Sequence, residues 1–419
     1  MNCTIEPSQM RGRATAPSSK SYTIRALIAA ALGCGTSQLY NPLYSDDTLA
    51  AIDVLTNLGV VITHKNGLLI VRGGSPVPSQ KPLNCRDSAA TLRFMAAICA
   101  ALPGISILEA RPGLARRPIT PLLEILKTMG ADYVYESNRI VVFGGDLRGG
   151  LYTIKGDLSS QFISALLLIA PLVREDVAYQ LDTMPRSRPY IEMTIETMHN
   201  FGVQVNTTTD FTLFKTSPQA YHPAGICIES DWSSASYLLA IGAIIGEITV
   251  EGLNLLSIQG DKILIQILQK MGAAILPDSN SVTVRPARLH AIKFDMSHCI
   301  DLLPTVAIAA ATADGTSYLS GIARARLKES NRVRAICEGL IQMGIQVEER
   351  PDMLIIHGGE PRGATINSFD DHRIAMAFAV LGLKTGNTTI TGAECVSKTF
   401  PSFWDTIQSL GGKIRIENG

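Results

Sequence analysis

Six glycines at nearly equal spacing constrain the fold of this chain more than any other sequence feature. Each ends a helical pattern of the form apolar, x, x, apolar, Gly, and successive glycines lie 67 to 72 residues apart. A glycine after an amphipathic run is the usual residue just beyond a helix, because it adopts the left-handed conformation without strain. The pattern therefore predicts six repeats, each with one amphipathic, partly exposed helix. The glycines are Gly59, Gly130, Gly202, Gly272, Gly344 and Gly411.

A second helix in each repeat is apolar around most of its circumference. Segments such as Ala26–Leu32 and Phe94–Leu102 have no polar face, which places these helices inside a core. Strand-like segments such as Leu68–Val71 and Ser281–Val284 follow the amphipathic helices, so each repeat is interpreted as a β-α-β-α-β-β module. A chain of 419 residues exceeds one ordinary core, so an α/β fold with two domains of three modules is expected. The buried helices are predicted to begin near Ser18, Ser88, Ser159, Ser233, Asp301 and Asp370.

Composition excludes several classes of function. Lys plus Arg and Asp plus Glu both number 37, and 6% of residues are aromatic, so neither a nucleic acid nor a membrane partner is expected. The eight cysteines form no Cys-x-x-Cys pair and are interpreted as reduced core thiols, with no metal site. Met1–Arg11 is polar and unlike a signal peptide, and no apolar run is long enough to span a bilayer. These features favour a cytoplasmic protein.

Polar residues concentrate at the starts of the apolar helices. One cap per helix is expected for stability alone, but runs such as Ser18–Ser21, Ser159–Gln161 and Asp371–Arg373 exceed that need. Helix N-termini carry partial positive charge and free N–H groups, which bind phosphate and carboxylate. If the helices run parallel within each domain, their starts converge on one surface, and the sequence predicts a site for two anionic substrates.

Seven segments in order along the chain resemble the 5-enolpyruvylshikimate-3-phosphate (EPSP) synthase family of enolpyruvyl transferases. Each segment alone is a weak signal, but seven in sequence, near repeat boundaries, are specific. The segments are Ala16–Ser21 with Arg25, Arg117–Pro118, Ser159–Gln161, Ser187–Tyr190, Leu327–Arg332, Asp371–Arg373 and Lys398–Pro401.

The resemblance implies the inside-out α/β architecture of the enolpyruvyl transferases. The chain would cross between the domains near Lys20 and near Asp231, which gives domains of residues 19–229 and residues 1–18 plus 230–419. The active site would lie in the cleft between them and would require domain closure. The family also implies a monomer without a metal or organic cofactor.

The activity implied by the resemblance is transfer of the enolpyruvyl group of phosphoenolpyruvate to the 5-hydroxyl of shikimate 3-phosphate. The hydroxyl adds to C2 while C3 gains a proton, and phosphate then leaves. Phosphoenolpyruvate presents a carboxylate and a phosphate, which suit the fork of arginine. By resemblance, its ligands are Lys20, Arg117, Gln161, Arg332, Arg373 and Lys398.

The remaining site residues also follow from the resemblance. Asp301 is the candidate base facing the sugar hydroxyl, and Glu329 the candidate group at C3, helped by Lys20. Which carboxylate performs which step stays open. Shikimate 3-phosphate would be held by Lys20, Ser21, Arg25, Ser159, Ser160, Gln161, Ser187, Tyr190, Asp301 and Lys328.

Structural alternatives exist for the two carboxylates. Asp301 before the apolar run from Leu303 has the pattern of a helix N-cap. Glu329 and Arg332, three residues apart, have the pattern of an ion pair on the surface of a helix. Without the resemblance, both structural interpretations would be preferred.

Two positions depart from the family pattern. Ala89 and Ala90 stand where the family has glycine and threonine, so the added methyl of Ala89 is expected to favour phosphoenolpyruvate over the longer inhibitor glyphosate. Arg324 stands where the family tends to have Asn or His.

Two other functions fit parts of the sequence. UDP-N-acetylglucosamine enolpyruvyl transferases share the six-module architecture, but they have Asn at the position of Ser21. They also have a characteristic Cys or Asp that acts as an acid in the loop that corresponds to Arg111–Pro118, and this chain has neither residue there. A non-catalytic phosphate-binding or RNA-end-binding module is the other alternative, and neutral charge with few aromatic residues disfavours it.

Overall fold

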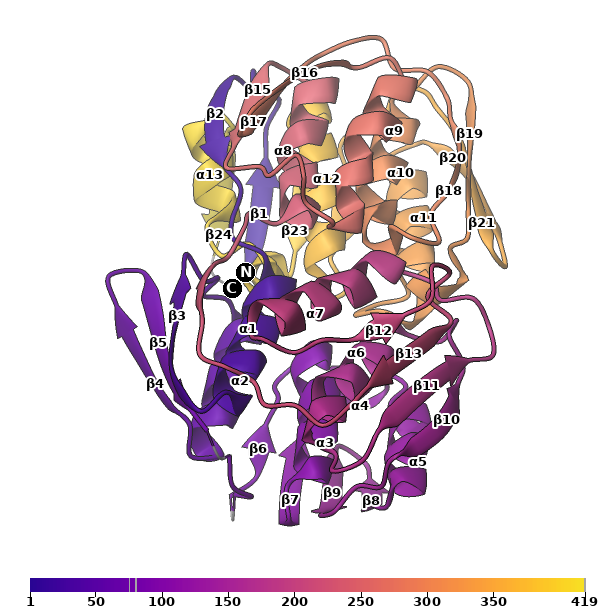
Figure 1. Cartoon of the computed structure of the whole chain (residues 1–419). Coiled ribbons are helices and arrows are strands. Elements are labelled where there is room, and N and C mark those ends of the chain that lie inside the picture. The colour runs from indigo at the N-terminus through magenta and orange to yellow at the C-terminus, as the bar shows by residue number, and fades with distance from the viewer. Residues whose placement is uncertain (75, 80, 418–419) are drawn as a thin grey trace. The chain divides into compact units, whose positions relative to one another are not determined.

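The structure is a computed structural model that describes residues 1–74, 76–79 and 81–417. The chain divides into two compact units, Met1–Pro17 with Ser230–Gly419 and Ser18–Glu229. The chain thus leaves one unit after Pro17 and the other after Glu229. Figure 1 labels helices and strands of both units.

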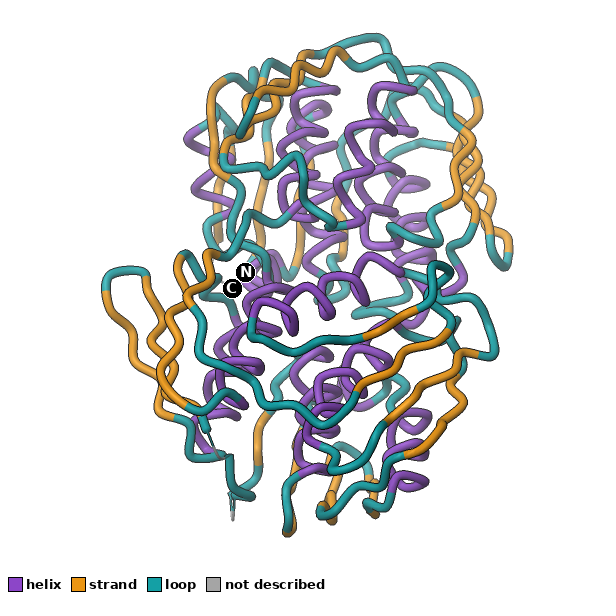
Figure 2. Tube along the Cα trace, viewed as in Figure 1, coloured by secondary structure: helices purple, strands orange, loops and turns teal. Residues whose placement is uncertain are grey.

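Among the described residues, six four-stranded sheets share one topology, with three sheets in each unit. In the sheet that runs β6 (Leu83–Asn84), β7 (Gly104–Glu109), β9 (Arg139–Gly144), β8 (Asp132–Glu136), the first pair is parallel and the others antiparallel. Helix α3 (Ala89–Ala101) connects the parallel strands. Within each unit the sheets surround a central group of helices (Figure 2). The predicted β-α-β-α-β-β module and α/β class are confirmed.

The unit Ser18–Glu229 contains three such modules. Besides those above, its elements are α1 (Lys20–Leu32), β3 (Gly35–Tyr40), α2 (Asp46–Asn57), β4 (Val61–Lys65), β5 (Leu68–Gly73), α4 (Pro112–Ala115), α5 (Thr120–Met129), β10 (Gly150–Ile154), α6 (Ser160–Ile169), η1 (Ala170–Leu172), β11 (Val177–Leu181), α7 (Arg188–Asn200), β12 (Asn206–Thr207), β13 (Leu213–Thr216) and β14 (Gly225–Cys227).

The other unit repeats the arrangement. Its elements are β1 (Asn2–Ile5), β2 (Gly12–Thr15), α8 (Trp232–Ile244), β15 (Ile248–Glu251), η2 (Gly260–Ile263), α9 (Leu264–Lys270), β16 (Ala274–Asp278), β17 (Ser281–Arg285), β18 (Lys293–Asp295), η3 (Ile300–Leu302), α10 (Leu303–Ala311), β19 (Thr316–Ser320), η4 (Ala323–Leu327), α11 (Arg332–Gln342), β20 (Gln346–Arg350), β21 (Met353–His357), β22 (Thr365–Asn367), α12 (His372–Thr385), β23 (Thr388–Thr391), η5 (Ala393–Lys398), α13 (Phe403–Ser409) and β24 (Ile414–Glu417).

Three strands complete sheets whose other strands are distant in sequence. The β2 strand pairs in parallel with β15, β14 pairs in parallel with β3, and β1 lies between β23 and β24. At each crossing the chain therefore leaves an edge strand in one unit and begins the buried helix of the other.

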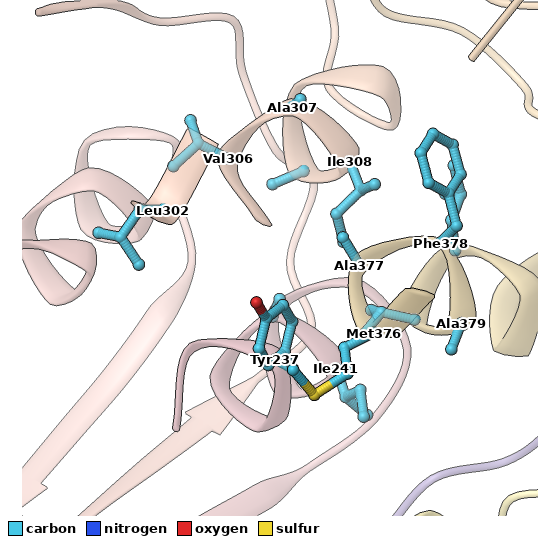
Figure 3. Packing of buried hydrophobic residues seen from close by; sticks show 14 of the residues in the cluster. Tyr237, Ile241, Leu302, Val306, Ala307, Ile308, Met376, Ala377, Phe378 and Ala379 are labelled. Carbon is cyan, nitrogen blue, oxygen red and sulfur yellow. The ribbon is translucent and has the colours of Figure 1, made fainter. Parts of the chain in front are cut away.

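The buried helices form the cores. In the unit that contains the C-terminus, α8, α10 and α12 pack against one another through side chains such as Tyr237, Val306 and Met376 (Figure 3). The amphipathic helices end as the repeat predicts, since all six repeat glycines have φ between 83° and 119°. Each glycine thus adopts the left-handed conformation that closes a helix.

Three details correct the sequence interpretation. Cys34 and Cys227 are exposed, so only the other six cysteines are core thiols. Asp301 is no N-cap, because it lies within the short 3-10 helix η3 and Leu302 precedes α10. Glu329 precedes α11, which begins at Arg332. No helix among the described residues is long and apolar enough to cross a membrane.

Candidate active site

One group of predicted site residues converges on Asp301. Its Oδ1 accepts from an Nη1 hydrogen of Arg332 at 2.6 Å and lies 3.2 Å from Nζ of Lys328, while its Oδ2 lies 3.3 Å from Nη2 of Arg373. These cations come from the residues before α11, from the start of α11 and from the first turn of α12. Residues up to 72 positions apart in sequence therefore meet at one carboxylate.

Arg332 organises this group, which we call the Asp301 cluster (Asp301, Lys328, Glu329, Arg332, Asp371 and Arg373). Its side chain is 1% exposed and also donates to Glu329 and, at 2.8 Å, to Asp371. Asp371 is fully buried and caps α12 by accepting from the backbone N–H of Arg373. The ion pair of Glu329 and Arg332 is thus an internal contact, not the surface pair that spacing alone suggested.

The charges of the cluster set its protonation. Burial opposes ionisation of Asp301, but the cations Arg373, Lys328 and Arg332 outweigh it and hold the pKa of Asp301 well below its usual range. Burial lowers the pKa of Lys328 to about 8, against the opposing charge of Asp301. At neutral pH the cluster therefore presents an ionised carboxylate among cations.

Lys398 lies apart from these contacts within the same unit. It ends η5, is 8% exposed, and its Nζ donates to the backbone carbonyl of Asp370 at 2.7 Å while also pairing with that residue's carboxylate at 2.7 Å. Because Asp370 directly precedes Asp371, this contact fastens Lys398 to the start of α12. That arrangement keeps a cation beside a helix N-terminus.

In the other unit, Lys20 and Ser21 begin α1. Nζ of Lys20 donates to Oδ2 of Asp47 at 2.8 Å, and Asp47 is 8% exposed in its side chain. Ser19 caps the helix by accepting from the backbone N–H of Tyr22. Lys20 is therefore held at a helix start by a carboxylate that the sequence interpretation missed.

Arg25 is 2% exposed and braces neighbouring helices. It donates to Thr194 at 2.7 Å, to the carbonyl of Ser21 at 3.0 Å and to the carbonyl of Tyr190 at 3.1 Å. Burial lowers its pKa to about 10. These contacts show Arg25 fixing the backbone of two predicted shikimate 3-phosphate ligands, and its own contact with that substrate stays a prediction.

Gln161 lies against a cation that the predicted site did not include. Arg93 donates to Oε1 of Gln161 at 2.5 Å and to the carbonyl of Pro118 at 2.8 Å, and its guanidinium lies over the Phe162 ring. Gln161 sits in the first turn of α6, whose cap is Ser159. Arg93 thereby joins the start of α6 to the segment that carries Arg117.

The remaining predicted residues of the same unit lie at helix starts, except Arg117. Ser160 begins α6 and is buried, Tyr190 is in the first turn of α7, and Ser187 caps α7 with a left-handed φ of 56°. Arg117 follows α4 and is partly buried. Ala89 is the first residue of α3 and is 5% exposed. Its predicted effect on glyphosate stays a prediction.

The missed residues left different signals in the sequence. A lone Arg93 within the apolar run of α3 is a signal that hydropathy alone gives. Asp47 lies in the first turn of an amphipathic helix and has the ordinary pattern of first-turn acids. No group of three or more potential metal ligands occurs among residues 1–74, 76–79 and 81–417.

The fold is that of the enolpyruvyl transferases. The enolpyruvyl transferase NikO from Streptomyces tendae superposes with a TM-score of 0.82 at 14% identity, over 99% of this chain and 98% of that one. An EPSP synthase from Acinetobacter baumannii superposes with a TM-score of 0.84 at 26% identity, over the full length of both.

Sequence comparison gives the family within that class. The model of EPSP synthase (3-phosphoshikimate 1-carboxyvinyltransferase) matches residues 5–407. A 3-phosphoshikimate 1-carboxyvinyltransferase of Dehalococcoides mccartyi is 46% identical over 99% of both chains, and one of Clostridium kluyveri is 37% identical over 98% of this chain and 97% of the relative. The chain belongs to the EPSP synthase family.

Its activity is that of a 3-phosphoshikimate 1-carboxyvinyltransferase, a transferase of the shikimate pathway in aromatic amino acid biosynthesis. The family implies shikimate 3-phosphate and phosphoenolpyruvate as substrates. The predicted family, fold class and activity are confirmed, in preference to the nucleotide-sugar transferase and the RNA-end-binding module.

Proposed function

We propose that the Asp301 cluster carries out the proton transfers of the reaction. The observation that supports this is an ionised, partly exposed carboxylate held by three cations, with Glu329 on the same arginine. Asp301 accepts the proton of the 5-hydroxyl while the hydroxyl oxygen forms its bond to C2. Glu329 delivers a proton to C3 and takes one back when the C2–O bond to phosphate breaks, which restores the double bond.

The low pKa of Asp301 is consistent with its role as a base once substrates are bound. Phosphate and carboxylate groups of the substrates bind the same kinds of cation that hold Asp301, namely Lys328 and Arg373. As substrate anions share these charges, the stabilisation of ionised Asp301 weakens and its proton affinity rises. The cluster is thus stable when empty and reactive when filled.

Residues of the unit Ser18–Glu229, several of them at helix starts, supply the other ligands in this proposal. Lys20, Arg117 and Gln161 bind phosphoenolpyruvate, joined by Arg332, Arg373 and Lys398. Ser21, Arg25, Ser159, Ser160, Ser187 and Tyr190, with Lys20, Gln161, Asp301 and Lys328, bind shikimate 3-phosphate. Hydroxyl groups beside helix N-termini suit a polyol phosphate.

We also propose that the protein acts in the cytoplasm as a monomer without a cofactor. The cysteines Cys3, Cys34, Cys85, Cys99, Cys227, Cys299, Cys337 and Cys395 are all free thiols, as in proteins of reducing compartments.

A labelling experiment tests the addition and elimination steps and the role of Glu329. In D2O, addition converts the C3 methylene of phosphoenolpyruvate to a CH2D group. Elimination then removes one of the three hydrogens of this group, and loss of a protium leaves deuterium in the product methylene. Mass spectrometry is expected to find this label with the wild-type enzyme, while Glu329→Gln is expected to lower turnover by about 10²-fold or more. Product without deuterium would contradict addition at C3.

Full turnover by Glu329→Gln would contradict the assignment of that residue. The control is Glu338→Gln, because Glu338 forms an exposed ion pair with Arg334 on α11.

A further inference from the structure

A second buried carboxylate lies beside the Asp301 cluster. Asp261 belongs to η2 and is 2% exposed, and one of its oxygens, Oδ2, accepts a hydrogen bond from the hydroxyl of Ser233 in the first turn of α8. Among the described residues, the structure shows no hydrogen-bond partner for its other oxygen, Oδ1. A buried carboxylate with an unsatisfied oxygen lowers the stability of the fold. Its presence at this position therefore indicates a function other than stability.

The surroundings of Asp261 mix both charges. Ser233 faces it from α8, Asp231 from the residue before α8, Asp301 from η3, Cys299 from the residue before η3, and Arg373 from α12. On its own element, Lys262 donates instead to the carbonyl of Leu255 at 2.9 Å. The adjoining helix α9 carries its charge at Lys270, which is exposed.

The charge of Asp261 is therefore finely balanced. Burial raises the pKa of Asp261 to about 6, the charge of Asp301 adds to the rise, and Arg373 and the Ser233 hydroxyl oppose it. Asp301 and Asp261 are thus neighbours of unequal acidity, since the pKa of Asp301 is held well below its usual range. Near neutral pH a small change in this environment decides whether one or both are ionised.

We propose that Asp261 is a positioning residue for the transfer reaction, whose ionised carboxylate repels ionised Asp301 and so makes Asp301 a stronger acceptor for the substrate proton. In that step the O–H bond of the substrate hydroxyl breaks, its proton passes to a carboxylate oxygen of Asp301, and the oxygen bonds to C2 while the C2=C3 π bond opens and C3 takes a proton from Glu329. Asp261 keeps its own protonation state and acts only through its charge. The proposal rests on the role of Asp301 proposed above.

The test is the pH dependence of kcat for the wild type relative to Asp261→Asn. Asparagine keeps the shape and an acceptor for Ser233 but removes the charge. A shift of about one pKa unit in a neighbouring base corresponds to a rate change of about 3- to 10-fold. The wild-type rate is expected to exceed the variant rate by that factor at pH 8. At pH 5 the two rates are expected to approach each other, because Asp261 of the wild type is then protonated and, like asparagine, uncharged. Ionisation of the substrates cancels in this ratio.

A ratio near one at every pH overturns the proposal, because the charge of Asp261 then has no effect on the rate. A ratio that differs from one but does not change with pH also overturns it, because a merely structural role gives that result. Ser233→Ala provides a second test that does not alter the carboxylate. Loss of the hydroxyl raises the pKa of Asp261 further, so this variant is expected to be slower than wild type near pH 6 to 7 and equal to it near pH 8.5. Equal rates of Ser233→Ala and wild type at every pH also overturn the proposal.

Asp301→Asn distinguishes a failure of the proposed role of Asp301 from a failure of the role of Asp261 alone. If Asp301→Asn is as active as wild type, the proposed role of Asp301 fails and the role of Asp261 fails with it. If Asp301→Asn is inactive while the ratio for Asp261→Asn is flat, only the inference about Asp261 fails.

Discussion

Asp301→Asn is expected to lower kcat by about 10²- to 10⁴-fold, because it removes the group that accepts the hydroxyl proton. Asparagine keeps the size of the side chain and a carbonyl oxygen for Arg332 and Lys328, so the cations that bind substrate anions remain. The measurement is steady-state phosphate release from phosphoenolpyruvate at saturating shikimate 3-phosphate.

The control for Asp301→Asn is Asp314→Asn, which breaks an exposed ion pair with Arg288 and is expected to leave kcat unchanged. Circular dichroism of both variants checks that folding is retained. An Asp301→Asn enzyme that is folded and has at least a tenth of the wild-type kcat would contradict Asp301 as the base.

Arg332→Met is expected to destabilise the unit that contains it by about 3–5 kcal/mol. The substitution leaves the carboxylates of Asp301, Glu329 and Asp371 without their shared cation in a buried site, and uncompensated buried charge is strongly unfavourable. Urea unfolding followed by tryptophan fluorescence measures this unit alone, because Trp232 and Trp404, the two tryptophans of the chain, both belong to it.

Arg334→Met is the matched control on the same helix. Arg334 is 72% exposed and pairs with Glu338 at 2.6 Å, so its loss is expected to change stability by about 0.5 kcal/mol or less. Equal unfolding midpoints for the two variants would contradict the view that Arg332 is the central cation of the cluster.

The repeat pattern predicted the fold because the glycine that ends a helix and the apolar composition of a buried helix are both local properties of the sequence. The position of Gly130 after α5 and the apolar circumference of α3 each follow from a few neighbouring residues, and their recurrence defines the module. The parallel pairing of β14 with β3 was not predicted, because a three-residue edge strand has little sequence pattern of its own.

The site was predicted unevenly for a related reason. The resemblance supplied Asp301 and Arg332, whose 2.6 Å contact spans 31 positions in sequence. Spacing alone favoured the wrong structural alternatives for Asp301 and Glu329. Asp47, Arg93 and Asp261 were missed because their importance lies in contacts made only after folding, with Lys20, Gln161 and Ser233.

The most direct test of the assigned activity is phosphate release from phosphoenolpyruvate by the purified protein, with shikimate 3-phosphate and UDP-N-acetylglucosamine as parallel acceptors. Release with shikimate 3-phosphate alone, lost in Asp301→Asn, is the predicted result. Release only with the nucleotide sugar, or with neither acceptor, would contradict the activity assigned to this chain.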